Sequence, residues 1–249
     1  MQSAIKNPEK LKMAIEDFVA FVDFKDHGRQ FSFVDESSFL GSKDGEGYKM
    51  KAALRARDEL QCEKWDESWI NSGKILERCK RAVGLNVNLI YWTYKKEFDD
   101  MLSPQNENFN PEAERTLYEI YKSRPGDEEK TAFENVKKIF GGSYRLIAYL
   151  FFVKAPSRFV PVSPEHFDEN VFPYLSTVYG LEVNYEKLSG KCSWENYMGF
   201  IKIVKEVQEI LQEKLPELVT IKSVRLIDAH SFLWLIGWEK FKEWNKKHK

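Results

Sequence analysis

The sequence predicts a mainly α-helical protein, an irregular multi-helix single domain with at most a few short strands. Apolar side chains recur at three- and four-residue spacing along most of the chain, and proline, serine and glycine interrupt that spacing where helices begin and end. Apolar residues make up 43% of the 249 residues and charged residues 31%, a composition that forms a buried core. We expect one domain over residues 1–249, with an N-terminal helical part, 1–142, and a C-terminal helical module, 143–249, as the alternative subdivision.

The first helix is predicted from Asn7, Pro8 and Glu9, which supply an N-cap, a proline in the first turn and an acidic side chain near the helix N-terminus. Its apolar face comprises Leu11, Ile15, Phe18 and Val22. The helical periodicity is lost over residues 25–48, where several glycines indicate a long loop. Within that loop we expect an edge strand at 31–34.

Two further helices are predicted over 49–63 and 68–83, because the first is rich in Ala, Leu and Arg and the second stops at a glycine. Over 85–94 the short apolar run fits both a strand and a buried helical turn. Residues 158–162 are expected to be an extended connector, because a proline disfavours helix in the residue before it. The other expected helices are 111–123, 127–140, 144–154, the segment after Ser163, Ser193–Pro216 and Leu226–Trp244.

Charge and cysteine content limit the classes of partner and location. Lys and Arg number 38 against 39 Asp and Glu, so nucleic-acid binding would require a local basic patch. Cys62, Cys79 and Cys192 show neither disulfide nor zinc-site spacing, which indicates free thiols in a reducing compartment. The N-terminus lacks a signal-peptide pattern, and the longest apolar stretch is too short to cross a bilayer. We therefore expect a cytoplasmic protein without membrane contact.

Two short runs resemble catalytic motifs but depart from them in spacing. Ser72-Gly73-Lys74 lacks the upstream glycine of a phosphate-binding loop and the hydroxyl that would bind magnesium, so we interpret it as a helix N-terminus. Asp228-Ala229-His230-Ser231 cannot converge on one substrate, because adjacent helical side chains diverge by about 100°. Asp228 is instead expected in the first turn of the last helix, where its charge complements the helix dipole.

A metal site is not predicted. The four histidines lack the spacings of zinc-binding helices, and His166 at a helix start is expected to cap the helix or lie at the surface. A nuclease of the restriction type needs clustered acidic residues and a lysine. The one Glu-x-Lys run, Glu128-Glu129-Lys130, is expected on the solvated face of a helix. We predict no catalytic residue, no metal and no cofactor.

The last predicted helix combines aromatic and basic side chains. They are Phe232, Trp234, Trp238, Phe241 and Trp244 together with Lys240, Lys242, Lys246, Lys247 and Lys249. Such a helix could follow a nucleic-acid backbone and stack a base. The more common origin of such a pattern is an amphipathic helix that packs its aromatic rings on the core, with a lysine-rich last turn that complements the dipole. The same two interpretations apply to Trp194 and Tyr197.

Four motifs of the C-terminal half, taken together, carry a family resemblance. They are LIAYLFF at 146–152, RFVPVSP at 158–164 followed by Phe167-Asp168, CSWENY at 192–197 and LIDAHSFLW at 226–234. They resemble a module of bacterial restriction-associated proteins that is often found upstream of HNH endonuclease domains. The resemblance implies a role in defence against foreign or modified DNA. Because this chain shows no HNH sequence, we expect the nuclease to be supplied elsewhere.

The leading prediction is a DNA-recognition or accessory module of a restriction-like defence system, without nuclease activity of its own. The candidate DNA contacts are Arg158, Trp194, Tyr197, His230, Lys242 and Lys246. One alternative is a protein-interaction scaffold or subunit that binds a nuclease or ATPase partner through exposed aromatic side chains. A second alternative is a metal-dependent nuclease whose site is assembled from distant segments.

Overall fold

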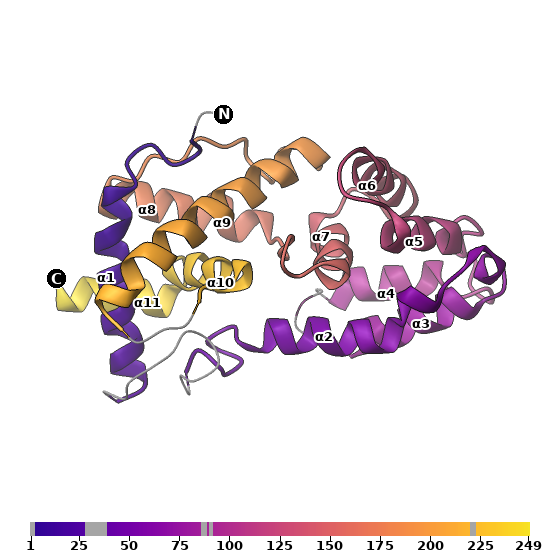
Figure 1. Ribbon diagram of the computed structural model, residues 1–249, viewed down its shortest axis with the longest axis horizontal. Helices are drawn as coiled ribbons and strands as arrows, with labels where there is room; N and C mark the ends of the chain where they lie inside the picture. Colours follow the sequence, from indigo (N-terminus) through magenta and orange to yellow (C-terminus); the bar gives the residue numbers. More distant parts are fainter. Residues whose placement is uncertain (1–2, 28–38, 86–88, 90–91, 220–222) are drawn as a thin grey trace. The chain divides into compact units, whose positions relative to one another are not determined.

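The computed structural model describes residues 3–27, 39–85, 89, 92–219 and 223–249 (Figure 1). Within these residues the chain forms eleven α-helices, three short 3₁₀ helices and one π-helix, and it forms no sheet. The predicted mainly α class is confirmed. The strand expected at 31–34 lies outside the described residues, as do five of the ten undecided positions over 85–94, and the last three of these ten begin α4 (Trp92–Met101). No helix among the described residues is long and apolar enough to cross a membrane.

The described residues divide into two compact units. Unit 1 contains Met1–Lys49, Ser163–Lys191 and Glu195–Lys249, and unit 2 contains Met50–Val162 and Cys192–Trp194. This division differs from the expected boundary at 142/143. The reason is that α7 (Tyr144–Lys154), which follows that boundary, packs on helices of unit 2 and buries nine of its side chains, from Tyr144 to Val153.

Unit 1 is a group of helices (Figure 1) that bury several aromatic side chains, among them Phe18, Phe21 and Phe232. Its first helix, α1, packs against three helices from later in the chain, α8, α10 and α11. Phe18 of α1 and Phe232 of α10 meet edge to face, with ring centroids 5.1 Å apart. The elements of this unit are α1 (Glu9–Lys25), the π-helix η3 (His166–Val171), α8 (Phe172–Tyr179), α9 (Trp194–Lys214) from its second residue, η4 (Leu215–Glu217), α10 (Leu226–Ile236) and α11 (Glu239–His248).

The last predicted helix is two helices. The expected helix Leu226–Trp244 is interrupted between α10 and α11, where Trp238 has an extended backbone (φ −76°, ψ 136°). Gly237 at the break packs so closely on η3 that a Cβ would lie 2.6 Å from Cγ2 of Val171. The pattern of apolar side chains continues through the break, so the sequence periodicity did not reveal it. The lysine-rich end of the chain therefore belongs to a separate short helix.

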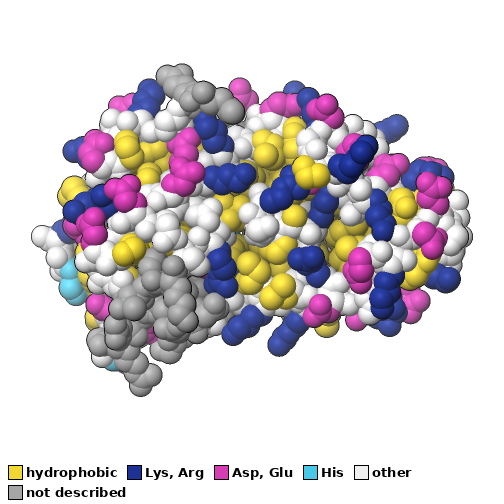
Figure 2. All heavy atoms as spheres, viewed as in Figure 1, with side chains coloured by type: hydrophobic (Ala, Val, Ile, Leu, Met, Phe, Trp, Pro, Cys, Tyr) yellow, Lys and Arg dark blue, Asp and Glu magenta, His cyan; other side chains and the backbone are white. Residues whose placement is uncertain are grey.

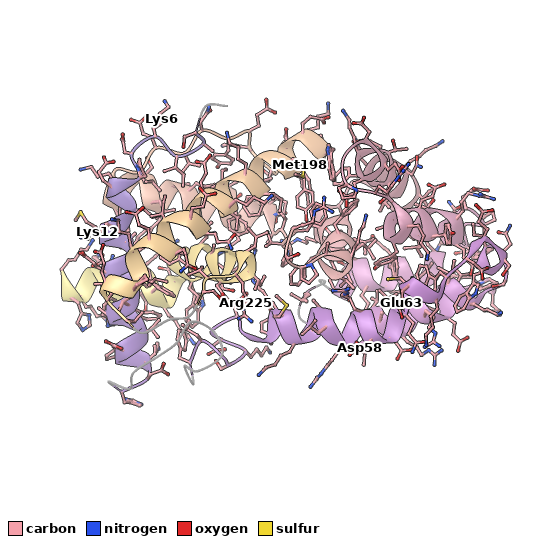
Figure 3. All side chains as sticks on the ribbon, in the orientation of Figure 1. Lys6, Lys12, Asp58, Glu63, Met198 and Arg225 are labelled. Carbon is pink, nitrogen blue, oxygen red and sulfur yellow. The ribbon has the colours of Figure 1, made fainter. Side chains whose placement is uncertain are left out.

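Unit 2 is built from α2 to α7. The helices α6 and α7 have the predicted bounds, whereas the helix expected over 68–83 begins only at Lys74, because Asn71 (φ 64°) and Gly73 (φ 79°) are left-handed and break it. The elements are α2 (Tyr48–Leu60), η1 (Cys62–Lys64), η2 (Glu67–Trp69), α3 (Lys74–Gly84), α4 (Trp92–Met101), α5 (Ala113–Lys122), α6 (Asp127–Phe140) and α7 (Tyr144–Lys154). Asp58 near the end of α2 and Glu63 in η1 are labelled in Figure 3.

Candidate functional site

The six candidate DNA contacts fall in both units. Arg158 and Trp194 belong to unit 2, whereas Tyr197, His230, Lys242 and Lys246 belong to unit 1. The burial and bonding of each side chain decide which of them can meet a ligand at the surface. On the face drawn in Figure 2, basic and acidic side chains are interspersed, in keeping with the net charge of −1.

Arg158 is held by a buried carboxylate. Its two terminal guanidinium nitrogens donate to the carboxylate oxygens of Glu129 at 2.8 and 2.6 Å, and Lys154 Nζ donates to the same carboxylate at 2.9 Å. Glu129 is fully buried, so the expected solvated face is wrong for this residue, whereas Glu128 and Lys130 on either side of it are exposed as expected. Burial raises the pKa of Glu129, but the hydrogen bonds from Arg158 and Lys154 outweigh this, so the pKa lies below its ordinary value. Arg158 therefore has a structural partner already.

Trp194 and Tyr197 follow the core-packing interpretation. The Trp194 ring lies 5.7 Å from both Phe133 and Phe151, measured between centroids, and 6.2 Å from Phe159. Trp194 stays partly exposed, but Tyr197 is completely buried. A buried side chain cannot be reached by a nucleic acid, so Tyr197 cannot contact DNA in the folded chain.

His230 is likewise completely buried, and it belongs to a charged cluster inside unit 1. Lys49 Nζ lies 3.2 Å from His230 Nδ1 and 4.6 Å from the ring centroid of Trp234, and it forms an ion pair with Glu46. Both the Lys49 and Glu46 side chains are at most 9% exposed. Burial lowers the pKa of Lys49, although Glu46 acts in the opposite direction. Because the cluster is closed to solvent, His230 cannot contact DNA from the folded surface.

Glycines place Glu46 in this cluster. Gly45 and Gly47 pass so close to the preceding backbone that a Cβ would lie 2.0 Å from the Phe39 carbonyl oxygen and 2.4 Å from that of Leu40. The glycine-rich run thus forms a compact turn that brings Glu46 to Lys49. The sequence showed the glycines but gave no sign that the Glu46–Lys49 ion pair is buried, because His230 and Trp234, which Lys49 contacts, are far from it in the chain.

His166 packs on the Trp234 ring, with ring centroids 4.1 Å apart, and its Nε2 donates to the Trp234 carbonyl oxygen at 2.9 Å. It therefore neither caps its own helix nor stands free at the surface. Burial lowers the pKa of His166 to about 4, and the nearby Lys49 and Lys242 contribute in the same direction. The side chain is neutral at pH 7 and supports the turn between α10 and α11.

Two polar runs that resembled catalytic motifs have structural roles. Asp228 accepts hydrogen bonds from the backbone nitrogen of Arg225 at 2.8 Å and from its guanidinium at 3.0 Å, which confirms its place in the first turn of α10. Arg225, the residue before α10, is labelled in Figure 3. Ser72-Gly73-Lys74 precedes α3 as predicted, and the buried carboxylate of Glu114 accepts from the backbone nitrogens of Gly73 and Ile75. A carboxylate thus already lies where a phosphate would have to bind.

Lys242 and Lys246 complete the predicted set. Lys242 is 18% exposed, and its Nζ donates to Asn170 Oδ1 at 3.1 Å. Lys246 is exposed on the last turn of α11, beside the exposed Lys247. Of the six candidates, Lys246 is the one whose charge is presented fully to solvent.

Aromatic rings lie where the end of α1 meets the last turn of α11, the turn that also carries Lys246. Phe24 of α1 is 56% exposed, and its ring lies 6.2 Å from Trp244 and 5.9 Å from His248 of α11. The rings of Trp244 and His248 are stacked with centroids 4.7 Å apart. We call Phe24, Trp244 and His248, together with Lys25, Lys246 and Lys247, the aromatic–lysine surface.

Phe24 was missed in the sequence although a signal existed. The buried stripe of α1 runs through Leu11, Ile15, Phe18 and Val22, and Phe24 does not fall on it. An aromatic side chain off the apolar stripe indicates an exposed position that packing does not explain.

Among the described residues no group of three or more histidine, cysteine, aspartate and glutamate side chains is placed to hold a metal ion. Comparison of the chain with protein-family models, curated proteins and solved structures found no match. The function of the chain is therefore inferred from the chemistry of its surface and from the motifs of its C-terminal half.

Proposed function

We propose that this chain is a DNA-recognition or accessory module of a restriction-like defence system that acts in the cytoplasm and supplies no nuclease activity itself. The resemblance of the C-terminal motifs supports the defence role. The observation that carries the DNA-binding part is the aromatic–lysine surface, where Phe24 is 56% exposed beside the lysine-rich last turn of α11. The exposed lysines of that turn and an exposed ring are the kinds of group that bind phosphates and stack on bases.

The electrostatics limit how this surface would bind. The net charge of −1 gives no long-range attraction, and Lys249 at the end of α11 is already paired with Asp17 at 2.8 Å. Binding would therefore use few phosphates, and its affinity would fall with salt by a correspondingly small slope. We expect aromatic stacking to contribute a larger share than in strongly basic DNA-binding domains.

The test is a titration of labelled single-stranded and duplex DNA, with and without modified cytosine, at several salt concentrations. Lys246→Gln with Lys247→Gln should weaken binding and lower the salt slope by about 1 to 2. Phe24→Ala should cost about 1–3 kcal/mol if a base stacks on the ring. Lys51→Gln with Arg55→Gln removes the same charge from exposed positions of unit 2 and serves as the control.

The proposal fails if no DNA binds at low salt, or if the control pair weakens binding as much as the α11 pair does. Cleavage of DNA by the purified chain with magnesium or manganese would contradict the proposal that it lacks nuclease activity. A second candidate function, a scaffold for a nuclease or ATPase subunit, is favoured by one observation, a pair of surface hollows on unit 2.

A further inference from the structure

Two hollows adjoin each other on the surface of unit 2. The larger, of about 410 Å³, lies between α5 and α6, and the smaller, of about 380 Å³, lies between η2 and α5. Tyr118 and Glu119 line both hollows and form the ridge between them. Each volume is in the range of sites that hold small ligands or a few side chains. The proposed DNA surface belongs to the other unit, so the function of the hollows can be tested independently.

The charge of the lining favours a cation over an anion. Four carboxylates and two cationic side chains line the hollows, and they are Glu67, Glu119, Asp127 and Glu128 against Arg115 and Lys122. The N-terminus of α6 opens on the larger hollow, but its first turn already holds three acidic side chains of its own. These carboxylates already interact with the positive end of the helix dipole, and their negative charge would repel a phosphate or a carboxylate ligand.

The ridge has the two groups that recognise a guanidinium. Glu119 Oε2 accepts from Asn135 Nδ2 at 2.8 Å, which fixes the carboxylate and leaves its other oxygen as an acceptor. The Tyr118 ring is half-buried, and Lys122 Nζ lies 6.0 Å from its centroid, so the ring already has a cation near its face. A planar guanidinium can stack on such a ring while it donates to an adjacent carboxylate.

The wall opposite the ridge is apolar enough to hold the aliphatic part of a side chain. Ala132 of α6 is buried at the floor, and Thr131 contributes its methyl group above it, since its hydroxyl donates to the Asp127 carbonyl oxygen at 2.9 Å. Arginine combines an apolar stem with a charged end, which matches this combination of floor and ridge.

We propose that the two hollows bind an arginine-containing segment of a partner protein, with one arginine side chain in each hollow and the Tyr118–Glu119 ridge between them. The segment is peptide rather than a free polyamine because two hollows on either side of one ridge, the larger with an apolar floor, match neighbouring side chains on one backbone. The excess of carboxylates over cationic side chains in the lining favours basic over acidic segments. The occupant is thus a partner with a basic, arginine-bearing stretch.

The test uses fluorescence anisotropy of the full chain with three labelled twelve-residue peptides in which arginine, lysine or glutamate alternates with alanine and leucine. The arginine peptide should bind more tightly than the lysine peptide, and the glutamate peptide should not bind. Tyr118→Leu and Glu119→Gln should each weaken the arginine peptide about three-fold, and together about ten-fold. Glu16→Gln, an equal charge change at an exposed position of α1, should change the affinity less than about two-fold.

Thermal unfolding of each variant checks that the fold is kept, which we expect because Tyr118 and Glu119 are partly exposed. The proposal is overturned if the arginine peptide does not bind, if the glutamate peptide binds as well, or if Glu16→Gln weakens binding as much as Glu119→Gln. Displacement of the arginine peptide by spermine at an equal concentration of charge would make the hollows a polyamine site and would also overturn it.

Discussion

Arg158 forms a bidentate pair with Glu129, in which Nη1 donates to Oε1 at 2.8 Å and Nη2 donates to Oε2 at 2.6 Å. The carboxylate lies near the start of α6, and Lys154, which donates to it at 2.9 Å, is the last residue of α7. One fully buried carboxylate thus joins the beginning of one helix to the end of the next and to the turn that follows. This arrangement makes Glu129 a structural anchor of unit 2.

Removal of that charge should destabilise the protein. Glu129→Gln leaves Lys154 and Arg158 without their carboxylate, and breaking a buried ion pair in this way costs about 3 kcal/mol of unfolding free energy. The neighbouring Glu128→Gln is the matched control, because Glu128 is exposed and pairs with Arg124, so its loss should leave the free energy of unfolding almost unchanged. Urea denaturation measures both, and equal midpoints for the two variants would contradict the anchor role.

The burial of Glu129 could have been predicted from the sequence, but its partners could not. The buried apolar side chains of α6 are Ala132, Phe133, Val136 and Phe140, and Glu129 falls on the same helical face. Its acidic neighbours in the first turn suggested a solvated end instead. Lys154 and Arg158 are brought to it by the packing of α7 on α6, and a pattern within one helix does not contain that information.

Acid should destabilise unit 1 through His166. Its pKa is lowered to about 4, so between about pH 6.5 and pH 4 the unfolded chain binds a proton that the folded chain does not. Stability is therefore lost as the pH falls through this window, by up to about 3 kcal/mol from this residue.

The measurement is the free energy of unfolding of the natural chain and of His166→Gln at pH 7.5 and pH 4.5. At pH 7.5 the difference between them reports the lost packing on Trp234 and the lost hydrogen bond. At pH 4.5 the difference should shrink, because the variant no longer has a histidine to protonate. Parallel stability curves for the two proteins over this range would refute the prediction.

The turn between α10 and α11 should tolerate no side chain at Gly237. A Cβ there would lie 2.6 Å from Val171 Cγ2 and 3.0 Å from His166 Nε2, so Gly237→Ala should cost about 1–3 kcal/mol. Gly199 of α9 has no atom within 4 Å of an added Cβ, so Gly199→Ala should stabilise the helix by about 0.5–1 kcal/mol. Thermal unfolding compares the two, and a melting temperature that rises for both would show that the contact at Gly237 is not tight.

The thiols should react slowly in the folded protein. Burial raises the pKa of Cys192 to about 11 and raises that of Cys62, while Cys79 is 2% exposed with a pKa well above its ordinary value. The reactive thiolate is then about a hundred-fold rarer at Cys192 than in a free cysteine at neutral pH. Ellman's reagent at pH 7.5 should modify Cys62 and Cys192 slowly and Cys79 only in denaturant. A fast phase from the native protein would contradict this.

The sequence predicted helices well and their interruptions poorly. The bounds of α6 and α7 followed from clear signals, such as the glycines on either side of α6. The break at Gly237 depends on contact with Val171, and the buried position of His230 depends on Lys49, each far away in the chain. Such contacts override a local pattern, which is why two of the six predicted DNA contacts, Tyr197 and His230, are core side chains.

The division into units has a consequence for synthesis on the ribosome. The apolar face of α1 packs against α8, α10 and α11, yet the whole of residues 50–162 is translated before the first of these partners emerges. The contacts of unit 2 lie almost wholly within that one continuous stretch, so unit 2 can fold before the partners of α1 are synthesised. Until then Phe18 and Phe21 of α1 remain exposed to solvent. A nascent chain whose first 162 residues have left the ribosome would therefore carry a folded unit 2 together with an N-terminal helix whose apolar face is still exposed.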